Sequence, residues 1–237
     1  MIAARSVSKR FGRISALDDL TLDVTGARIT AIVGPNSAGK TTFAKCILGL
    51  TRPDSGSIQF NGAPIGDDAS YRSHIGYMPQ IARFPENLTA AELFAMLRDV
   101  RPPGTPLDED LISGLGLSGE LGKPFRTLSG GTRQKVNAVM AFLFKPDLFI
   151  LDEPTAGLDP IASGVLKDKI RSERSVGKTF ILTSHIMSEL EELAEDVAFI
   201  HEGRVGFAGP VKELIRTTRE NTLERAIAQM MKHGVAA

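Results

Sequence analysis

The stretch that decides the fold is Gly34-Pro35-Asn36-Ser37-Ala38-Gly39-Lys40-Thr41-Thr42. The β-branched apolar run before it, residues 29–33, is typical of a buried strand. After it, Phe43, Ile47 and Leu48 recur at helical spacing, so a helix is expected to begin near Gly39. A strand, a glycine-rich loop and a helix in this order predict a P-loop that binds phosphate groups.

The residue types in this loop suit a triphosphate. Glycine lets the backbone curl until successive N–H groups point inward. The helix N-terminus adds unpaired donors and a partial positive charge. Lys40 is then expected to reach the β- and γ-phosphates, and the Thr41 hydroxyl to hold Mg²⁺. The chain is therefore predicted to bind a nucleoside triphosphate.

Length and composition narrow the remaining choices. The 237 residues fit one domain, possibly with a subsidiary lobe, that buries roughly 70% of its unfolded surface. Basic and acidic residues balance at 28 each, which does not indicate a nucleic-acid-binding surface. A lone cysteine, Cys46, fits a reducing cytosol and is expected to be a packed core thiol. No signal peptide is expected, and the longest apolar stretch, residues 138–144, is too short to cross a bilayer.

The first eighty residues read as strands around the P-loop. Leu20, Leu22 and Val24 alternate with polar residues, and residues 57–60 precede an Asn61-Gly62 hairpin turn. These segments predict an antiparallel β piece attached to the P-loop core. Another strand is expected over residues 75–78.

Residues 81–144 change character and predict a helical insertion between strands of the sheet. Thr89 and Glu92 form a capping box, so a helix is expected to begin there and to stop before Pro102. A second glycine-rich helix start follows at Ser129-Gly130-Gly131, and it suits an anion for the same reason as the first. An ordinary N-cap by Ser129 explains that pattern equally well.

Two further strands end in polar residues that can carry chemistry. The apolar run 148–151 is typical of a strand buried in a parallel sheet, and it leads into Asp152-Glu153. Open α/β sheets hold their ligands at this end of the strands, where an aspartate can hold Mg²⁺ and a glutamate can deprotonate an attacking water. His185 follows the strand predicted at 180–183, so it is expected at the same rim.

The end of the chain predicts a β-hairpin and a helix. Residues 197–200 and 205–208 flank Glu202-Gly203, and a helix capped by Asn221 and Glu224 is expected to carry an apolar stripe.

Together these motifs make the chain resemble the ATP-binding subunit of ABC transporters over essentially its full length. The correspondences run in family order: residues 34–42 to the Walker A motif, Gln80 to the Q-loop, residues 128–134 to the signature motif, residues 149–153 to Walker B, residues 157–159 to the D-loop, and His185 to the switch histidine. The resemblance implies an α/β fold: a P-loop NTPase (RecA-like) core with an antiparallel β subdomain and an inserted α-helical subdomain. The implied division is a core of residues 1–80 and 145–210, a helical subdomain of 81–144, and a C-terminal helical extension of 211–237.

The resemblance also implies a role for each site residue, with ATP and Mg²⁺ as the ligands. The nucleotide would be bound by Phe11, which stacks on adenine, and by Gly34, Pro35, Asn36, Ser37, Ala38, Gly39, Lys40, Thr41 and Thr42. Thr41, Gln80 and Asp152 would serve the metal, Glu153 would polarise water, and Gln80 and His185 would complete the catalytic set. Ser129, Gly130 and Gly131 would close over the nucleotide of a second copy in a head-to-tail dimer.

The implied partners are therefore a second ATPase subunit and an integral-membrane permease, with the chain held at the cytoplasmic face of the cell membrane and no nucleic acid bound. Ser37 stands where glycine is common and Thr132 where glutamine is common, and neither change removes a charge. Within the family, the chain is similar to subunits of ABC-2-type exporters. It is also similar to the ATPase of the copper-processing system that matures nitrous-oxide reductase. Met187, Met230, Met231 and His233 are conceivable copper ligands, although a core or exposed-tail interpretation is favoured.

Two other functions compete with this one. A soluble ABC ATPase acting on ribosomes or DNA is the alternative, but such proteins carry paired domains or long coiled coils, and neither pattern occurs here. A P-loop kinase is disfavoured by the combination of Glu153, the Ser129 helix and His185. The sequence does not identify the transported substrate, its direction of transport or the membrane partner. It also does not decide between a homodimer and a heterodimer, or whether copper has a role.

Overall fold

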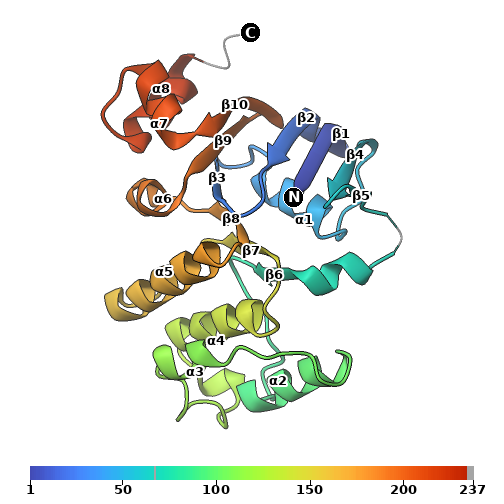
Figure 1. Cartoon of the computed structure of the whole chain (residues 1–237), viewed down its shortest axis with the longest axis vertical. Helices are drawn as coiled ribbons and strands as arrows, with labels where there is room; N and C mark the ends of the chain where they lie inside the picture. Colours follow the sequence, from blue (N-terminus) through green and yellow to red (C-terminus); the bar gives the residue numbers. More distant parts are fainter. Residues whose placement is uncertain (67, 234–237) are drawn as a thin grey trace.

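A six-stranded, mainly parallel sheet lies at the centre of the computed structural model, which describes residues 1–66 and 68–233 (Figure 1). Its strands are β3 (Ile29–Val33), β6 (Ile75–Met78), β7 (Leu148–Asp152), β8 (Thr179–Thr183), β9 (Asp196–His201) and β10 (Arg204–Pro210). The order is β10-β9-β3-β8-β7-β6, and only β10 runs antiparallel to its neighbour. Every residue of β3, β7 and β8 is buried, which explains their continuous apolar runs.

A second, antiparallel sheet confirms the predicted β piece. Its strands are β1 (Ile2–Phe11), β2 (Ile14–Val24), β4 (Ser55–Phe60) and β5 (Ala63–Pro64), in the order β2-β1-β4-β5. The sequence did not predict β1. Its alternation is broken because Ser6 has a positive φ of 48° and the register with β2 shifts between Ala4 and Val7 and again before Lys9.

Three α-helices fall between β6 and β7, as the sequence predicted for residues 81–144. They are α2 (Ala90–Asp99), α3 (Asp110–Gly114) and α4 (Gly130–Phe142), with 3₁₀ turns η1 (Ser70–His74) and η2 (Phe125–Thr127) nearby. The capping box is confirmed, since Glu92 N donates to Thr89 Oγ1 at 3.2 Å and Thr89 N to Glu92 Oε2 at 2.8 Å. In Figure 1 these helices form one end of the molecule, away from both β1 and α8.

The remaining helices are α1 (Lys40–Ile47), α5 (Pro160–Ser175), α6 (Met187–Leu193), α7 (Val211–Thr218) and α8 (Leu223–His233). Helix α1 begins directly after Gly39, as expected. The predicted cap of α8 was wrong by one residue, because Thr222 Oγ1, and not Asn221, accepts a hydrogen bond from Arg225 N at 3.3 Å. The helix also starts where Glu191 Oε2 accepts from Leu223 N at 2.9 Å, which ties α8 to α6.

Two apolar cores lie on opposite faces of the six-stranded sheet. Ala31 and Val33 of β3 face the core shared with α4, α5 and α8, whereas Ile32 faces the core shared with α1 and the antiparallel sheet. In the first core, Phe149 of β7 packs between two rings, with centroids 4.4 Å from Phe142 of α4 and 4.5 Å from Phe180 of β8. Helix α4 is therefore fastened to the strand that leads into Asp152.

Cys46 is expected to resist alkylation in the folded protein. Its side chain is buried in the second core, and this burial raises the pKa of the Cys46 thiol from 9.0 to about 11. Because only the thiolate reacts, iodoacetamide at pH 8 should modify it about 100-fold more slowly than in the unfolded chain. Mass spectrometry of native and urea-unfolded samples measures this ratio, and equal rates would show that the thiol is accessible.

Candidate functional site

A cavity of about 310 Å³ opens where the P-loop meets the carboxyl ends of the central strands. It is lined by Ile14, Ala16, Asn36, Ser37, Ala38, Gly39, Lys40, Thr41, Thr42, Gln80, Asp152, Glu153 and His185. The structure thus brings together loop residues, the end of β7, and two residues that follow β6 and β8. These segments are far apart in the chain, and the parallel strand order places them at one edge.

Two glycines allow the P-loop its close packing against neighbouring backbone. A side chain at Gly34 would place Cβ 2.0 Å from Ile200 O, and one at Gly39 would place it 2.4 Å from Ala16 O. Gly39 also has a φ of 108°, which L-residues rarely adopt. The turn after β9 supports the loop from outside, because Gly203 N donates to Ala38 O at 3.0 Å.

Lys40 folds its ammonium back onto the loop. Nζ donates to Gly34 O at 2.7 Å and to Pro35 O at 2.9 Å, so the chain itself holds the cation at the mouth of helix α1. Burial lowers the pKa of Lys40, and the carboxylates of Asp152 and Glu153 oppose that change. The ammonium is therefore positioned beside the P-loop donors where a phosphate oxygen would lie.

Ser37 adopts the backbone conformation for which glycine is common in this loop. Its φ is 65°, a left-handed geometry that costs a residue with a Cβ about 1–2 kcal/mol. The loop therefore keeps its curl with serine in place, at some cost in stability.

The two carboxylates at the end of β7 have different surroundings. Asp152 Oδ1 accepts a hydrogen bond from the Thr183 hydroxyl, which lies opposite it on β8. Glu153 is buried, with a positive φ of 52°, a conformation that stores strain at functional sites. Its Oε2 accepts from His185 N at 3.2 Å, and its Oε1 lies 3.6 Å from His185 Nε2.

This arrangement suits magnesium and a water nucleophile. Thr41, Gln80 and Asp152 present a hydroxyl, an amide and a carboxylate to one cavity, and oxygen donors of this kind are those that Mg²⁺ prefers. Glu153 offers a carboxylate, fixed by the His185 backbone, as a proton acceptor beside the same space.

Six predicted residues lie outside this cavity lining, and two of them, Gly34 and Pro35, belong to the P-loop, where their carbonyls accept from Lys40. Phe11 ends β1 with its ring half exposed, and Lys9 Nζ lies 5.5 Å from the ring centre. Ser129, Gly130 and Gly131 begin α4, where Ser129 Oγ accepts from Thr132 N at 3.1 Å as an ordinary N-cap. The two glycine-rich helix starts of the chain therefore do not share one cavity.

Sequence reasoning missed three contributors to the site. Ile14 and Ala16 line the cavity from the start of β2, and Thr183 binds the Asp152 carboxylate. Ile14 and Ala16 have apolar side chains that do not mark a binding site, and the Thr183 position in sequence indicates only the end of a strand. Their roles depend on the packing of β2 against the P-loop and on the register of β7 with β8.

The positions of the methionines that were conceivable copper ligands favour a role in core packing or an exposed position over copper binding. Met187 and Met230 pack against the main apolar core, and Met231 is 40% exposed. The side chain of His233 lies outside the described part of the structure.

Comparison with known proteins agrees with this geometry. The sequence profile of the ABC transporter family matches residues 17–156. The Nod factor export ATP-binding protein I of Ralstonia nicotianae is 33% identical over 226 residues, covering 91% of this chain and 68% of that protein. A solved ATP-binding subunit of an ABC transporter superposes with a TM-score of 0.88 at 29% identity, covering 98% of this chain and 99% of the other. A dimeric post-hydrolysis ATP-binding cassette with ADP and Pi shares the fold, with a TM-score of 0.79 at 22% identity, over 89% of this chain and 98% of the other.

The chain therefore belongs to the ABC transporter family. Within that family it is an ATP-binding ATPase subunit, which confirms the predicted fold class and activity.

Proposed function

We propose that this chain hydrolyses Mg·ATP to drive export through a separate membrane-spanning subunit, acting as one of two ATPase copies. The observation that carries the proposal is the single cavity in which Lys40, Thr41, Gln80, Glu153 and His185 meet. The similar protein named for Nod factor export supports the exporter assignment, and favours transport over an action on ribosomes or DNA.

Each side chain takes a role that its position supports. The P-loop amides and Lys40 bind the phosphates, while Phe11, which pairs on β1 with the cavity residue Ile14 of β2, stacks on the base. Thr41, Gln80 and Asp152 would hold Mg²⁺, which would neutralise negative charge on the phosphates.

Hydrolysis then depends on Glu153 and His185. Water attacks the γ-phosphorus and gives its proton to the Glu153 carboxylate, while the bond to the bridging oxygen breaks and its electron pair leaves with ADP. His185 lies beside that carboxylate, where its imidazole would contact the γ-phosphate. The exclusion of water around the buried Glu153 strengthens these charge interactions.

The second glycine-rich helix start supports a head-to-tail dimer. Ser129, Gly130 and Gly131 lie outside the chain's own cavity, at the positively polarised end of the 13-residue helix α4. In the dimer, this end closes over the ATP held by the P-loop of the other copy, so that two nucleotides are enclosed between two subunits.

The membrane partner is an integral-membrane permease, and this chain acts at the cytoplasmic face of the membrane through it. Within residues 1–66 and 68–233, no helix is both long and apolar enough to span a bilayer. We assign residues 1–80 and 145–210 to the nucleotide-binding core, 81–144 to the helical subdomain and 211–237 to the C-terminal extension. The grouping of α2, α3 and α4 at one end of the molecule supports this division (Figure 1).

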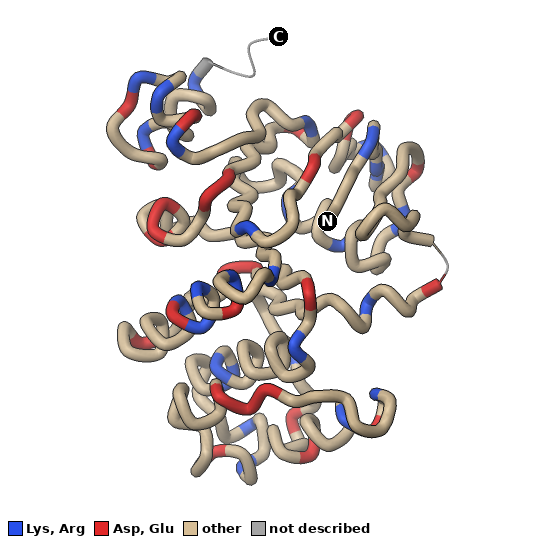
Figure 2. The backbone as a smooth tube through the Cα atoms, viewed as in Figure 1, with Lys and Arg blue, Asp and Glu red and all other residues tan. Residues whose placement is uncertain are grey.

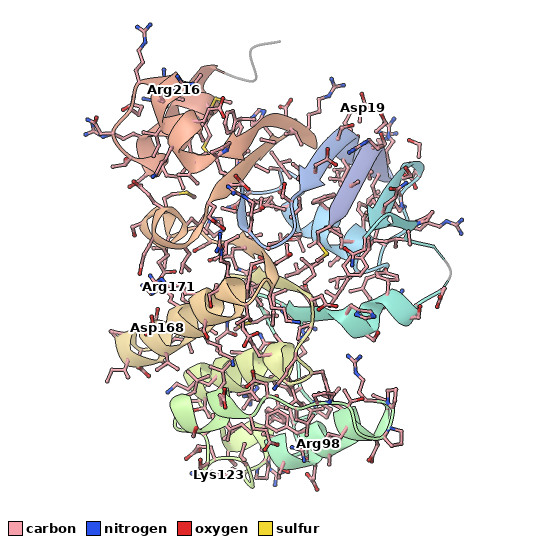
Figure 3. The ribbon with its side chains drawn as sticks, in the orientation of Figure 1. Asp19, Arg98, Lys123, Asp168, Arg171 and Arg216 are labelled. Carbon is pink, nitrogen blue, oxygen red and sulfur yellow. The ribbon has the colours of Figure 1, made fainter. Side chains whose placement is uncertain are left out.

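The charge distribution supports a partner other than nucleic acid. Figure 2 shows basic and acidic residues interspersed on α5, where Asp168 and Arg171 form a 2.9 Å ion pair. Figure 3 shows Arg98 and Lys123 at the helical end and Arg216 at the opposite end, so these cations do not form one basic surface. A phosphate backbone binds best to a continuous basic surface.

Purified protein is expected to release phosphate from ATP in the presence of Mg²⁺ and to lose this activity when EDTA removes the metal. The reason is that the site offers oxygen ligands and one ammonium against the four negative charges of ATP. A phosphate-release assay with added MgCl₂ to reverse the chelation provides the measurement. Transfer of phosphate to an acceptor molecule in place of water would contradict the proposal.

A further inference from the structure

Helix α4 contains a pair of buried amides on a face that is otherwise apolar. Gln134 is 8% exposed and Asn137 is 2% exposed, and they lie one turn apart on the helix. Their neighbours Val136, Ala138 and Val139 are fully buried in the core. Buried amides are costly unless they are hydrogen-bonded, so the partners of these two side chains matter.

The amide hydrogens are all directed at defined acceptors. Gln134 Nε2 donates to Glu153 O at 3.2 Å and to Pro154 O at 3.4 Å. Asn137 Nδ2 donates to Pro79 O at 2.9 Å and to Gln134 Oε1 at 3.4 Å. The pair therefore forms a continuous chain of hydrogen bonds between two backbone segments.

Those segments carry the residues that the proposed chemistry uses. Pro79 directly precedes Gln80, and its carbonyl lies just beyond the end of β6. Glu153 and Pro154 lie just beyond the end of β7, which pairs with β6 so that Met78 is opposite Leu151. Backbone carbonyls beyond the ends of the strands are not hydrogen-bonded within the sheet. When they are buried, they need other hydrogen-bond donors.

We propose that Gln134 and Asn137 are positioning residues that hold the Gln80 and Glu153 backbones in register with the Ser129 end of α4. The inference rests on the proposed function, because it concerns hydrolysis in the cavity and nucleotide contact at that helix end. Ser129 caps the same helix five residues before Gln134. If a nucleotide at the N-terminus of α4 displaces this helix, the side chains of Gln134 and Asn137 transmit the displacement to the Glu153 and Pro79 carbonyls.

The geometry of Glu153 explains why such support matters. Its backbone is held at a φ of 52°, so the direction of its carboxylate depends on contacts that maintain this strained conformation. Gln134 binds the carbonyl of that same residue, while the His185 N–H binds its carboxylate. A misplacement of about 1 Å at a catalytic group can reduce the rate about 100-fold.

The test compares Gln134→Glu with wild-type protein by steady-state ATP hydrolysis. An ionised carboxylate keeps the size of the amide but cannot donate to the Glu153 and Pro154 carbonyls. We expect kcat to fall at least about tenfold while KM for ATP changes less than about threefold, because the P-loop contacts are untouched.

Gln229→Glu is the matched control. Gln229 is another partly buried amide, on α8, and its Oε1 is buried. It should lose thermal stability without losing kcat. A folded Gln134→Glu protein with wild-type kcat, or one whose KM rises in step with the loss of kcat, would overturn the inference.

Asn137→Ser provides the second variant, and it decides the question if Gln134→Glu does not fold. Serine keeps a hydroxyl but is too short to span from Pro79 O to Gln134 Oε1, so the same selective loss of kcat is expected. Wild-type protein without ATPase activity would contradict the proposed function. Active wild-type protein with unaffected variants would contradict only the positioning role.

Discussion

Replacing Glu153 by Gln is expected to reduce kcat for ATP by about 100- to 10,000-fold, which is the range that a positioned general base contributes. The amide keeps the shape of the side chain, and its oxygen can still accept the hydrogen bond from His185 N that Glu153 Oε2 now accepts at 3.2 Å. It cannot take a proton from water, however, so binding and chemistry should separate. ATP affinity should change less than about threefold.

The measurement combines phosphate release with equilibrium binding of ATP. Because hydrolysis no longer consumes the nucleotide, the Glu153→Gln protein should also elute as a dimer from a size-exclusion column run with Mg·ATP. Glu224→Gln, on the exposed start of α8, is the control and should behave like wild-type protein. Hydrolysis at the normal rate in Glu153→Gln would show that another group is the base.

Replacing Lys40 by Met is expected to remove both binding and turnover. The change keeps the length of the side chain but deletes an ammonium whose pKa is lowered by burial and which lies within the P-loop. A charge-assisted contact of this kind is worth about 1.5–3 kcal/mol, which corresponds to a loss of ATP affinity of about 10- to 150-fold. Hydrolysis should fall further, because the developing charge on the γ-phosphate also loses its partner.

Lys45→Met is the matched control for this prediction. Lys45 lies in the last turn of the same helix, α1, and is exposed. The control should retain ATP affinity and hydrolysis within about twofold, since an exposed charge at that distance is screened by salt. Fluorescent-nucleotide titration of both proteins measures the difference, and equal affinities would show that Lys40 does not contact the phosphates.

The sequence predicted the strands that are mostly buried and lie between turn residues. The strands expected at 29–33 and 75–78 were confirmed at the same bounds, because continuous apolar runs between turn residues leave little choice of limit. The cavity residues followed from the same logic, because Asp152 and His185 each come directly after a strand and parallel strands end at one edge.

The parts that escaped prediction depend on tertiary contacts. Strand β1 lacks regular alternation because its register with β2 shifts, so local pattern did not identify it. The cavity wall formed by Ile14 depends on how β2 meets the P-loop, and no residue type at that position signals it. The sequence pattern of α4 did not indicate a role for Gln134 and Asn137, because the carbonyls to which they donate belong to residues distant in sequence.

The close packing of the Phe142, Phe149 and Phe180 rings has a mechanical consequence. Close-packed side chains resist sliding, so α4, β7 and β8 should move as one block when the molecule changes shape. Any hinge between the helical end and the sheets must then lie in the connections on either side of α2 and α3, and not within α4 itself. A displacement of α2 and α3 that moves α4 would therefore also move β7, and with it the wall of the ATP cavity at Asp152 and Glu153.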